Sequence, residues 1–180
     1  MLALGNGVRA SGVARTKAAL IGHTGRGNYG HGLDAIFDAR PGIEVVAVAD
    51  PDGPGRAKAQ ARVRAPRAYA DYREMLEKEK PQLVSICPRV TGERHAMLAA
   101  ALAVGAHVYC EKPLCHTVFE VLALMNEAKE RKLVTQMGTQ IHAGDNYRRV
   151  VEHVRSGVLG EVTEVHTWVG GDYAAGDFPK

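Results

Sequence analysis

Residues 18–30 read AALIGHTGRGNYG, an apolar run followed at once by a turn rich in glycine. The run 18–21 predicts a short buried strand, and the apolar spacing over 28–39 predicts a helix after the turn. In dinucleotide-binding folds, such a turn leads from a strand into a helix whose N-terminal N–H groups face a pyrophosphate. The stretch therefore predicts an α/β fold that begins with a candidate nucleotide-binding turn.

Two frames of the glycine motif fit this turn. The earlier frame, 22–27, has a threonine in place of the second glycine, and the later frame, 25–30, matches G-x-G-x-x-G in full. We prefer the earlier frame because its first glycine turns directly off the strand. On the motif alone, a flexible turn without a ligand remains the alternative. The earlier frame gives five candidate cofactor-binding residues: Gly22, Thr24, Gly25, Arg26 and Gly27.

An acidic residue follows the second predicted strand. Residues 43–49 read IEVVAVA, which is typical of a strand covered on both faces, and Asp50 comes directly after them. An acid at this place binds the ribose hydroxyls of NAD, and its charge would repel the 2′-phosphate of NADP. The alternative is a solvated turn over 50–53, DPDG. We interpret Asp50 as cofactor-binding and expect NAD, with NADP less favoured.

Strand and helix patterns continue to alternate along the chain. Further strands are predicted at 83–87, 106–110 and 133–137, and helices at 54–63, 71–80, 93–104, 117–132 and 145–156. Such alternation implies right-handed crossovers and a Rossmann-like, doubly wound parallel sheet. Residues 162–169 alternate apolar and polar side chains instead, which predicts the first strand of a truncated α/β second domain.

This order predicts three parts. Residues 1–17 carry glycines and no acid, and we expect a disordered tail or a mis-started reading frame there. Residues 18–138 are expected to form the Rossmann dinucleotide-binding domain. Residues 139–180 are expected to hold a linker helix and the beginning of a substrate domain that is incomplete in this sequence.

Composition narrows the class of protein. Hydrophobic residues are 46% and charged residues 24% of the 180 residues, as in ordinary soluble globular proteins, and no apolar run is long enough for a membrane helix. The net charge of +3 comes from the first twenty residues, which hold three basic residues and no acidic one, so the rest of the chain is neutral. This charge distribution predicts no nucleic-acid surface. Three cysteines without a CxxC pair predict neither disulfides nor a metal site, and favour the cytoplasm.

Residues 106–114, AHVYCEKPL, place two opposite charges and a proline after a predicted strand. In an open parallel sheet, ligands bind at the carboxyl ends of the strands. Lys112 there could take a hydroxyl proton if its pKa were lowered toward neutrality. The alternative is a surface lysine paired with Glu111, although alternation along an extended segment predicts that the two side chains point opposite ways.

These motifs together resemble the glucose–fructose oxidoreductase, inositol dehydrogenase and rhizopine-catabolism family, the Gfo/Idh/MocA oxidoreductases. The resemblance covers roughly residues 18–170 and rests on IGHTGRG (21–27), AVADPD (47–52), ICP (86–88), GAHVYCEKPL (105–114) and GTQIHAGDNYRRVVEHVRSGVLGEV (138–162). It implies that Lys112 lies beside the nicotinamide as the catalytic residue and that the bond before Pro113 is cis. It also implies cofactor-binding positions at Pro88, His95, Glu111, Pro113 and Gln140.

The resemblance implies NAD(P)-dependent hydride transfer at a carbinol of a sugar- or cyclitol-like substrate. The family's usual histidine and aspartate partners of the lysine come from the second domain, most of which we expect to fall outside these residues. The expected partner is a small molecule, without nucleic acid or membrane, and the full-length protein could form a homo-oligomer. A non-catalytic NAD-binding fragment or sensor is the alternative. A methyltransferase using S-adenosylmethionine is disfavoured because it gives no reason for the EKP tripeptide at 111–113.

Overall fold

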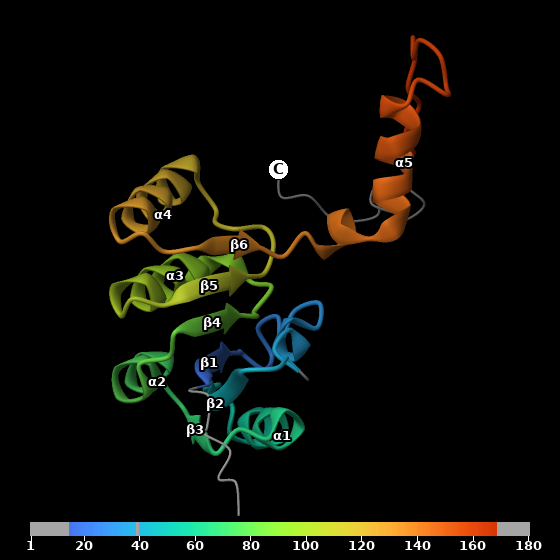
Figure 1. The fold of residues 1–180 in the computed structure, drawn as a ribbon. Coiled ribbons are helices and arrows are strands. Elements are labelled where there is room, and N and C mark those ends of the chain that lie inside the picture. The colour runs from blue at the N-terminus through green and yellow to red at the C-terminus, as the bar shows by residue number, and fades with distance from the viewer. Residues whose placement is uncertain (1–14, 39, 169–180) are drawn as a thin grey trace, which may run out of the picture. The chain divides into compact units, whose positions relative to one another are not determined.

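A six-stranded parallel sheet forms the centre of the protein in the computed structural model, which describes residues 15–38 and 40–168 (Figure 1). Its strand order is β3-β2-β1-β4-β5-β6, and every neighbouring pair is parallel. This is the order of a doubly wound Rossmann sheet, so the predicted fold class is confirmed. The strands are β1 (Thr16–Ile21), β2 (Ile43–Ala49), β3 (Arg67–Tyr69), β4 (Leu83–Ile86), β5 (His107–Cys110) and β6 (Thr135–Met137).

Helices connect the strands where the sequence predicted them, with one exception discussed below. The α-helices are α1 (Gly53–Val63), α2 (Tyr72–Glu79), α3 (Arg94–Ala103), α4 (Val118–Glu130) and α5 (Asp145–Arg155). Three short 3-10 helices accompany them: η1 (Leu33–Ala35), η2 (Thr91–Glu93) and η3 (Gln140–Ala143). A capping box formed by Thr117 and Glu120 fixes the start of α4, because each side chain bonds the backbone N–H of the other residue.

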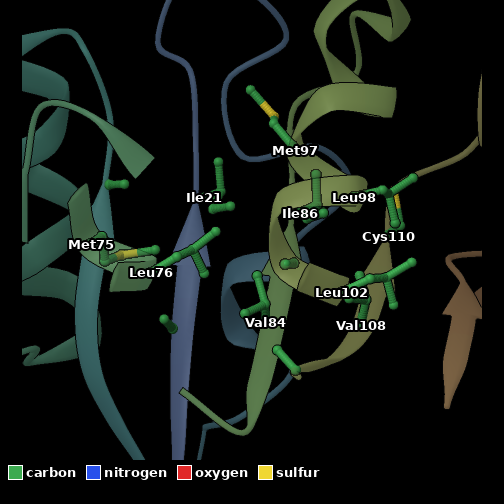
Figure 2. Close-up of a cluster of buried hydrophobic side chains, with 14 of the residues drawn as sticks. Ile21, Met75, Leu76, Val84, Ile86, Met97, Leu98, Leu102, Val108 and Cys110 are labelled. Carbon is green, nitrogen blue, oxygen red and sulfur yellow. The ribbon is translucent and has the colours of Figure 1, made fainter. Parts of the chain in front are cut away.

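Helices α2, α3 and α4 cover one face of the sheet, and α1 covers the other (Figure 1). The larger core lies under α2, α3 and α4 and combines their apolar side chains with those of the strands. Figure 2 shows the part of it that comes from α2, α3 and the strands. Its members include Met75 and Leu76 of α2 and Leu98 and Leu102 of α3, each at most 2% exposed. Each such side chain contributes roughly 1.5–3 kcal/mol through burial. These contacts fix the sheet whose carboxyl edge carries the candidate site.

The glycine-rich turn does not lead into an α-helix. The predicted helix over 28–39 is wrong: only the single 3-10 turn η1 forms among its described residues. Gly30 and Gly32, like Asn28, have φ between 51° and 81°, a left-handed conformation that no right-handed helix contains. The apolar spacing has a different cause, because Leu33 is 1% exposed and its carbonyl accepts a hydrogen bond from the Ser85 hydroxyl.

Two further expectations differ from the structure. Strand β3 was not predicted, because three residues, RAY, carry no readable alternation. The described part of the predicted last strand, 162–168, forms no strand, and Val169 lies outside the described residues. A strand without a neighbour leaves its backbone N–H and C=O groups unpaired, so an isolated segment does not hold that conformation.

The described residues divide into two compact units, one ending at Thr139 and one beginning at Gln140. The first contains the whole sheet, and β1 begins at Thr16, two residues before the predicted strand. The expected tail lies outside the described residues up to position 14. The second unit contains η3 and α5. Among the described residues, no helix has the length and apolar character that crossing a membrane requires.

Candidate functional site

The candidate site lies at the carboxyl edge of the sheet, where the strand order reverses between β1 and β4. The turn after β1 lies directly on the segment that follows β4. A Cβ on Gly27 would come within 2.3 Å of the Arg89 backbone nitrogen, and one on Gly30 within 2.5 Å of the Cys87 carbonyl oxygen. Both glycines also have positive φ, 94° and 62°. The glycines therefore serve close backbone packing at the point where ligands bind in such sheets.

Hydrogen bonds within the turn give it a hairpin-like shape. The Asn28 N–H donates to the His23 carbonyl at 2.9 Å, and the Gly25 N–H donates to the Asn28 side-chain oxygen at 2.9 Å. The Arg26 N–H also donates to the His23 carbonyl, at 3.0 Å. Both candidate frames of the glycine motif lie in this non-helical turn, so the helix N-terminus expected for a pyrophosphate does not form here.

Asp50 is fully buried at the end of β2, and its carboxylate accepts hydrogen bonds from the turn. The Thr24 hydroxyl donates to it at 2.8 Å and the Thr24 N–H at 3.1 Å. The Tyr29 hydroxyl donates at 2.9 Å, and the Asp52 N–H at 3.0 Å. The predicted residues Thr24 and Asp50 are thus brought together. Asp50 holds the turn against the sheet as well as facing the pocket described below.

Tyr29 is a residue of this site that the sequence did not reveal. Its ring occupies the space next to Gly22, where a Cβ would come within 2.3 Å of the ring carbons. Burial, and then the neighbouring Asp50 carboxylate, raise the pKa of the Tyr29 hydroxyl, so it remains a hydrogen-bond donor. The only signal in the sequence is an aromatic residue within a turn of small and polar residues.

A pocket of about 260 Å³ opens beside Gly22 and Asp50. Its wall also includes His23, Arg73 and Glu93. Ligand pockets commonly enclose about 300–1,000 Å³, so this space suits one half of a dinucleotide rather than the whole. The pocket joins the first glycine of the turn and the acid after β2, which are the two features of the predicted nucleotide site.

Glu93, the last residue of η2, bonds two side chains of the glycine-rich turn. Its carboxylate accepts a hydrogen bond from His23 Nδ1 at 2.9 Å and forms an ion pair with the Arg26 guanidinium. Arg26 is one of the predicted cofactor-binding residues, and His23 and Glu93 were not predicted. The Glu93 side chain is 38% exposed, so water competes with Arg26 and His23 for its carboxylate.

The EKP tripeptide follows β5 at the same edge. The Glu111 N–H donates to the Ile86 carbonyl at 2.9 Å, which extends the sheet by one residue. Glu111 is fully buried and Lys112 is exposed, so the two side chains point opposite ways as alternation predicts. The bond between Lys112 and Pro113 is cis, which confirms the expectation from the resemblance.

The Glu111 carboxylate joins this segment to the glycine-rich turn. It accepts hydrogen bonds from the His31 N–H at 2.7 Å, the His31 ring at 2.9 Å and the Lys112 N–H at 2.8 Å. Burial acts to raise the pKa of Glu111, but these hydrogen bonds together outweigh it, so its pKa lies below the ordinary value. A buried, ionised carboxylate therefore holds Lys112 in place through its backbone.

The remaining predicted residues lie in different surroundings. Pro88 is buried after β4, and its carbonyl accepts a hydrogen bond from the Arg94 guanidinium. His95 is partly buried in the first turn of α3. Gln140 is exposed in η3, in the second unit. None of these three contributes to the wall of the pocket beside Asp50.

Comparisons with known proteins agree with this geometry. A family model described as "Oxidoreductase family, NAD-binding Rossmann fold" matches residues 16–139. An inositol 2-dehydrogenase of Salmonella typhimurium (strain LT2) is 33% identical over 152 residues, which cover 82% of this chain and 44% of that protein. An inositol 2-dehydrogenase of Leifsonia xyli subsp. xyli is 33% identical over 145 residues, covering 79% and 41%.

Solved structures give the same picture. A myo-inositol 2-dehydrogenase from Lactobacillus plantarum superposes with a TM-score of 0.71 at 25% identity, covering 82% of this chain and 43% of that one. A scyllo-inositol dehydrogenase from Lactobacillus casei, solved with NAD(H) and scyllo-inositol, has a TM-score of 0.71 at 19% identity, covering 83% and 43%, and shows the shared fold. The chain thus spans less than half the length of these relatives.

Proposed function

The chain belongs to the Gfo/Idh/MocA oxidoreductases, a family with an NAD-binding Rossmann fold, and we propose from this that it forms the nucleotide-binding part of an NAD-dependent dehydrogenase. The observation that carries the proposal is the pocket between the glycine-rich turn and the buried Asp50. It lies at the switch point of the sheet, where dinucleotides bind in this fold. The substrate and the activity of the whole protein are parts of the same proposal, since the matched region covers only 44% of the relative from Salmonella typhimurium.

The residues of the pocket fit the adenosine half of NAD. Gly22 and Asp50 both line the pocket, and the Asp50 carboxylate is the kind of acceptor that ribose hydroxyls require. Its present donors, the Thr24 and Tyr29 hydroxyls, would have to share it with a bound ribose. The same carboxylate would repel a 2′-phosphate, which favours NAD over NADP. Arg26 and His23 supply the positive charge and donors suited to a pyrophosphate.

Lys112 is the proposed catalytic residue, with its ammonium at the same sheet edge. Bound NAD would supply the hydride acceptor for oxidation of a carbinol. As the carbinol is oxidised, its hydroxyl proton must leave, and the Lys112 Nζ, when neutral, can accept it. Glu111 fixes the Lys112 backbone through its N–H and directs its own charge inward.

The proposed substrate is a sugar- or cyclitol-like carbinol. Support comes from relatives named inositol 2-dehydrogenases. The match with this chain covers 44% of one of them and 41% of the other. We place the protein in the cytoplasm because its three cysteines are free thiols, and we propose a homo-oligomer for the whole protein on the family resemblance. The predicted division into a Rossmann domain over 18–138 and a partial substrate domain over 139–180 is likewise part of the proposal, as are Pro88, His95 and Gln140 as cofactor contacts.

The proposal is tested by titrating the 180-residue chain with NADH and following nicotinamide fluorescence. We expect saturable binding by the wild-type chain, and at least about tenfold weaker binding by Asp50→Ala, because a charge-assisted hydrogen bond is lost. Asp52→Ala is the matched control, since it removes a neighbouring carboxylate whose role is to cap α1. Circular dichroism must show both variants folded. A folded wild-type chain that binds no NADH overturns the proposal.

A second candidate is a non-catalytic NAD-binding module. It is favoured by one observation: within residues 15–38 and 40–168, no carboxylate or histidine is paired with the Lys112 ammonium. Turnover of myo-inositol with NAD by the purified chain, abolished in Lys112→Ala, would exclude this candidate. NADH binding without turnover would support it.

A further inference from the structure

The glycine-rich turn carries two side chains that can bind an anion, and both are already bound to a carboxylate of the chain itself. Glu93, at the end of η2, accepts a hydrogen bond from His23 Nδ1 at 2.9 Å through one oxygen. Its other oxygen forms the ion pair with the Arg26 guanidinium. The two oxygens of one carboxylate therefore satisfy the turn's arginine and histidine together, as two oxygens of a phosphate group could.

Glu93 lies in the wall of the pocket rather than behind it. His23, Asp50 and Glu93 line the same 260 Å³ space. The side chain of Glu93 is 38% exposed and that of Arg26 is 54% exposed, whereas the His23 side chain is 18% exposed. An anionic ligand that enters this pocket therefore meets the negative charge of Glu93 and competes with it for Arg26 and His23.

We propose that Glu93 is an internal competitor for the diphosphate group of nucleotides: its carboxylate occupies the anion-binding side chains of the turn and must release them when a diphosphate binds. This inference rests on the proposed nucleotide-binding function and assigns Glu93 an effect on affinity, not a catalytic role. The ligand class follows from the proposed nucleotide site, because replacing the carboxylate on both Arg26 and His23 needs a group with at least two anionic oxygens, and the phosphates are the anionic groups of a nucleotide. A nucleoside without phosphate leaves the Glu93 contacts intact.

The proposal makes Glu93 a residue that weakens binding. Removing its charge while keeping its shape should free Arg26 for the ligand and remove a repulsion from the pocket. Because the pair is partly exposed, the gain is modest, roughly fivefold in affinity at low salt. Screening by added salt should reduce the gain, since the Debye length falls to about 3 Å at 1 M.

The test measures the affinity of the wild-type chain and of Glu93→Gln for three probes, NADH, ADP and adenosine, by calorimetry at low salt. We expect NADH and ADP to bind Glu93→Gln roughly fivefold more tightly and adenosine to bind both proteins equally. The matched control is Glu127→Gln, which removes the same charge from another Arg–Glu pair, with Arg131 on α4. This control should bind all three probes as the wild-type chain does.

A third variant shows whether the effect passes through the arginine. In the Arg26→Ala background, Glu93→Gln should raise the affinity for ADP by less than in the wild-type background, because the competition for the guanidinium no longer exists and only the release of His23 and the loss of repulsion remain. Equal or weaker binding of ADP by Glu93→Gln than by the wild-type chain overturns the inference. An equal gain for adenosine also overturns it, since the effect would then be a general change of the pocket. Failure of all proteins to bind NADH counts against the proposed function instead.

Discussion

Glu111 and His31 are eighty positions apart in the sequence and are joined by two hydrogen bonds, from the His31 N–H at 2.7 Å and from its ring at 2.9 Å. The bonds tie the strand end that carries Lys112 to the turn that carries the glycine motif. The side chain of Glu111 is fully buried, so water cannot replace these donors. The distance between the proposed catalytic lysine and the proposed cofactor turn is thus set by one buried carboxylate.

Replacing Glu111 with glutamine should lower the free energy of unfolding by about 1–3 kcal/mol at pH 7, because an amide leaves at least one buried donor unpaired. Since the pKa of Glu111 is lowered by its hydrogen bonds in the folded protein, its ionised form stabilises the fold above the ordinary value of 4.5. This contribution is lost as the pH falls through the folded-state pKa. Urea titrations between pH 3 and 7 should show a shallower loss of stability for Glu111→Gln.

Glu127→Gln is the control for that series, because its partner Arg131 and the carboxylate lie at the surface of α4. Its unfolding curve should follow the wild-type curve at every pH. Part of the acid dependence should survive in Glu111→Gln, since the pKa of Glu79 is also lowered, through its bonds to Arg67 and Tyr69 against an opposing effect of burial. A wild-type slope in Glu111→Gln would show that the carboxylate is not ionised in the fold.

Alanine substitutions at two glycines of the turn distinguish the cost of a strained backbone φ from the cost of a steric overlap. Gly25 and Gly27 both have left-handed φ, 81° and 94°, but only Gly27 lies against other backbone atoms. Gly25→Ala should cost about 1 kcal/mol of stability for the strained φ. Gly27→Ala should cost roughly 1–3 kcal/mol more, because its Cβ would overlap the Arg89 nitrogen. Equal losses on chemical denaturation would mean that the turn can lift away from this segment.

The three cysteines should react at very different rates. Burial raises the pKa of the Cys87 and Cys110 thiols to about 12, and both are buried. Burial also raises the pKa of Cys115, but this residue is only partly buried. Because the thiolate is the reactive form, Ellman's reagent at pH 8 should label Cys115 first and the other two only on unfolding. Mass spectrometry can follow the labelling of each cysteine over time. Rapid labelling of all three in the folded chain would contradict the described burial.

In a protein that oxidises a cyclitol as proposed, Lys112→Ala should lower kcat by about 100- to 10,000-fold, the usual contribution of a positioned proton acceptor. NADH affinity should change by less than about threefold, because the side chain is exposed and the backbone contact to Glu111 remains. Lys132→Ala, an exposed lysine after α4, is the matched control and should leave kcat unchanged. Loss of NADH binding together with kcat would assign Lys112 to cofactor binding rather than proton transfer.

The sheet could be predicted because most of its strands are short runs of apolar residues in the sequence. The uniformly apolar end of β1, from Ala18 to Ile21, is buried on both faces, and helices α2 and α4 begin after Asp71 and Thr117, residue types that favour a helix N-cap. The positions of Asp50 and Lys112 at strand ends followed from the same pattern. Parallel pairing then brings those ends to one edge without further information.

The inside of the site could not be predicted, because its contacts join residues far apart in the chain. Glu93 meets Arg26 across 67 positions, and no local pattern indicates this partner. The helix predicted after the turn failed because spacing of apolar residues says which side chains are buried and not which backbone brings them there. Leu33 is buried as expected, but from a 3-10 turn among left-handed glycines.

The strand order has a consequence for how this chain is made. Strand β1 is synthesised first and ends in the middle of the sheet, between β2 and β4. On the ribosome, β2 can pair with it early, but its other edge has no neighbour until residues 83–86 emerge. An apolar strand with a free edge is a template for aggregation, so we expect the nascent chain to be prone to aggregation during this interval.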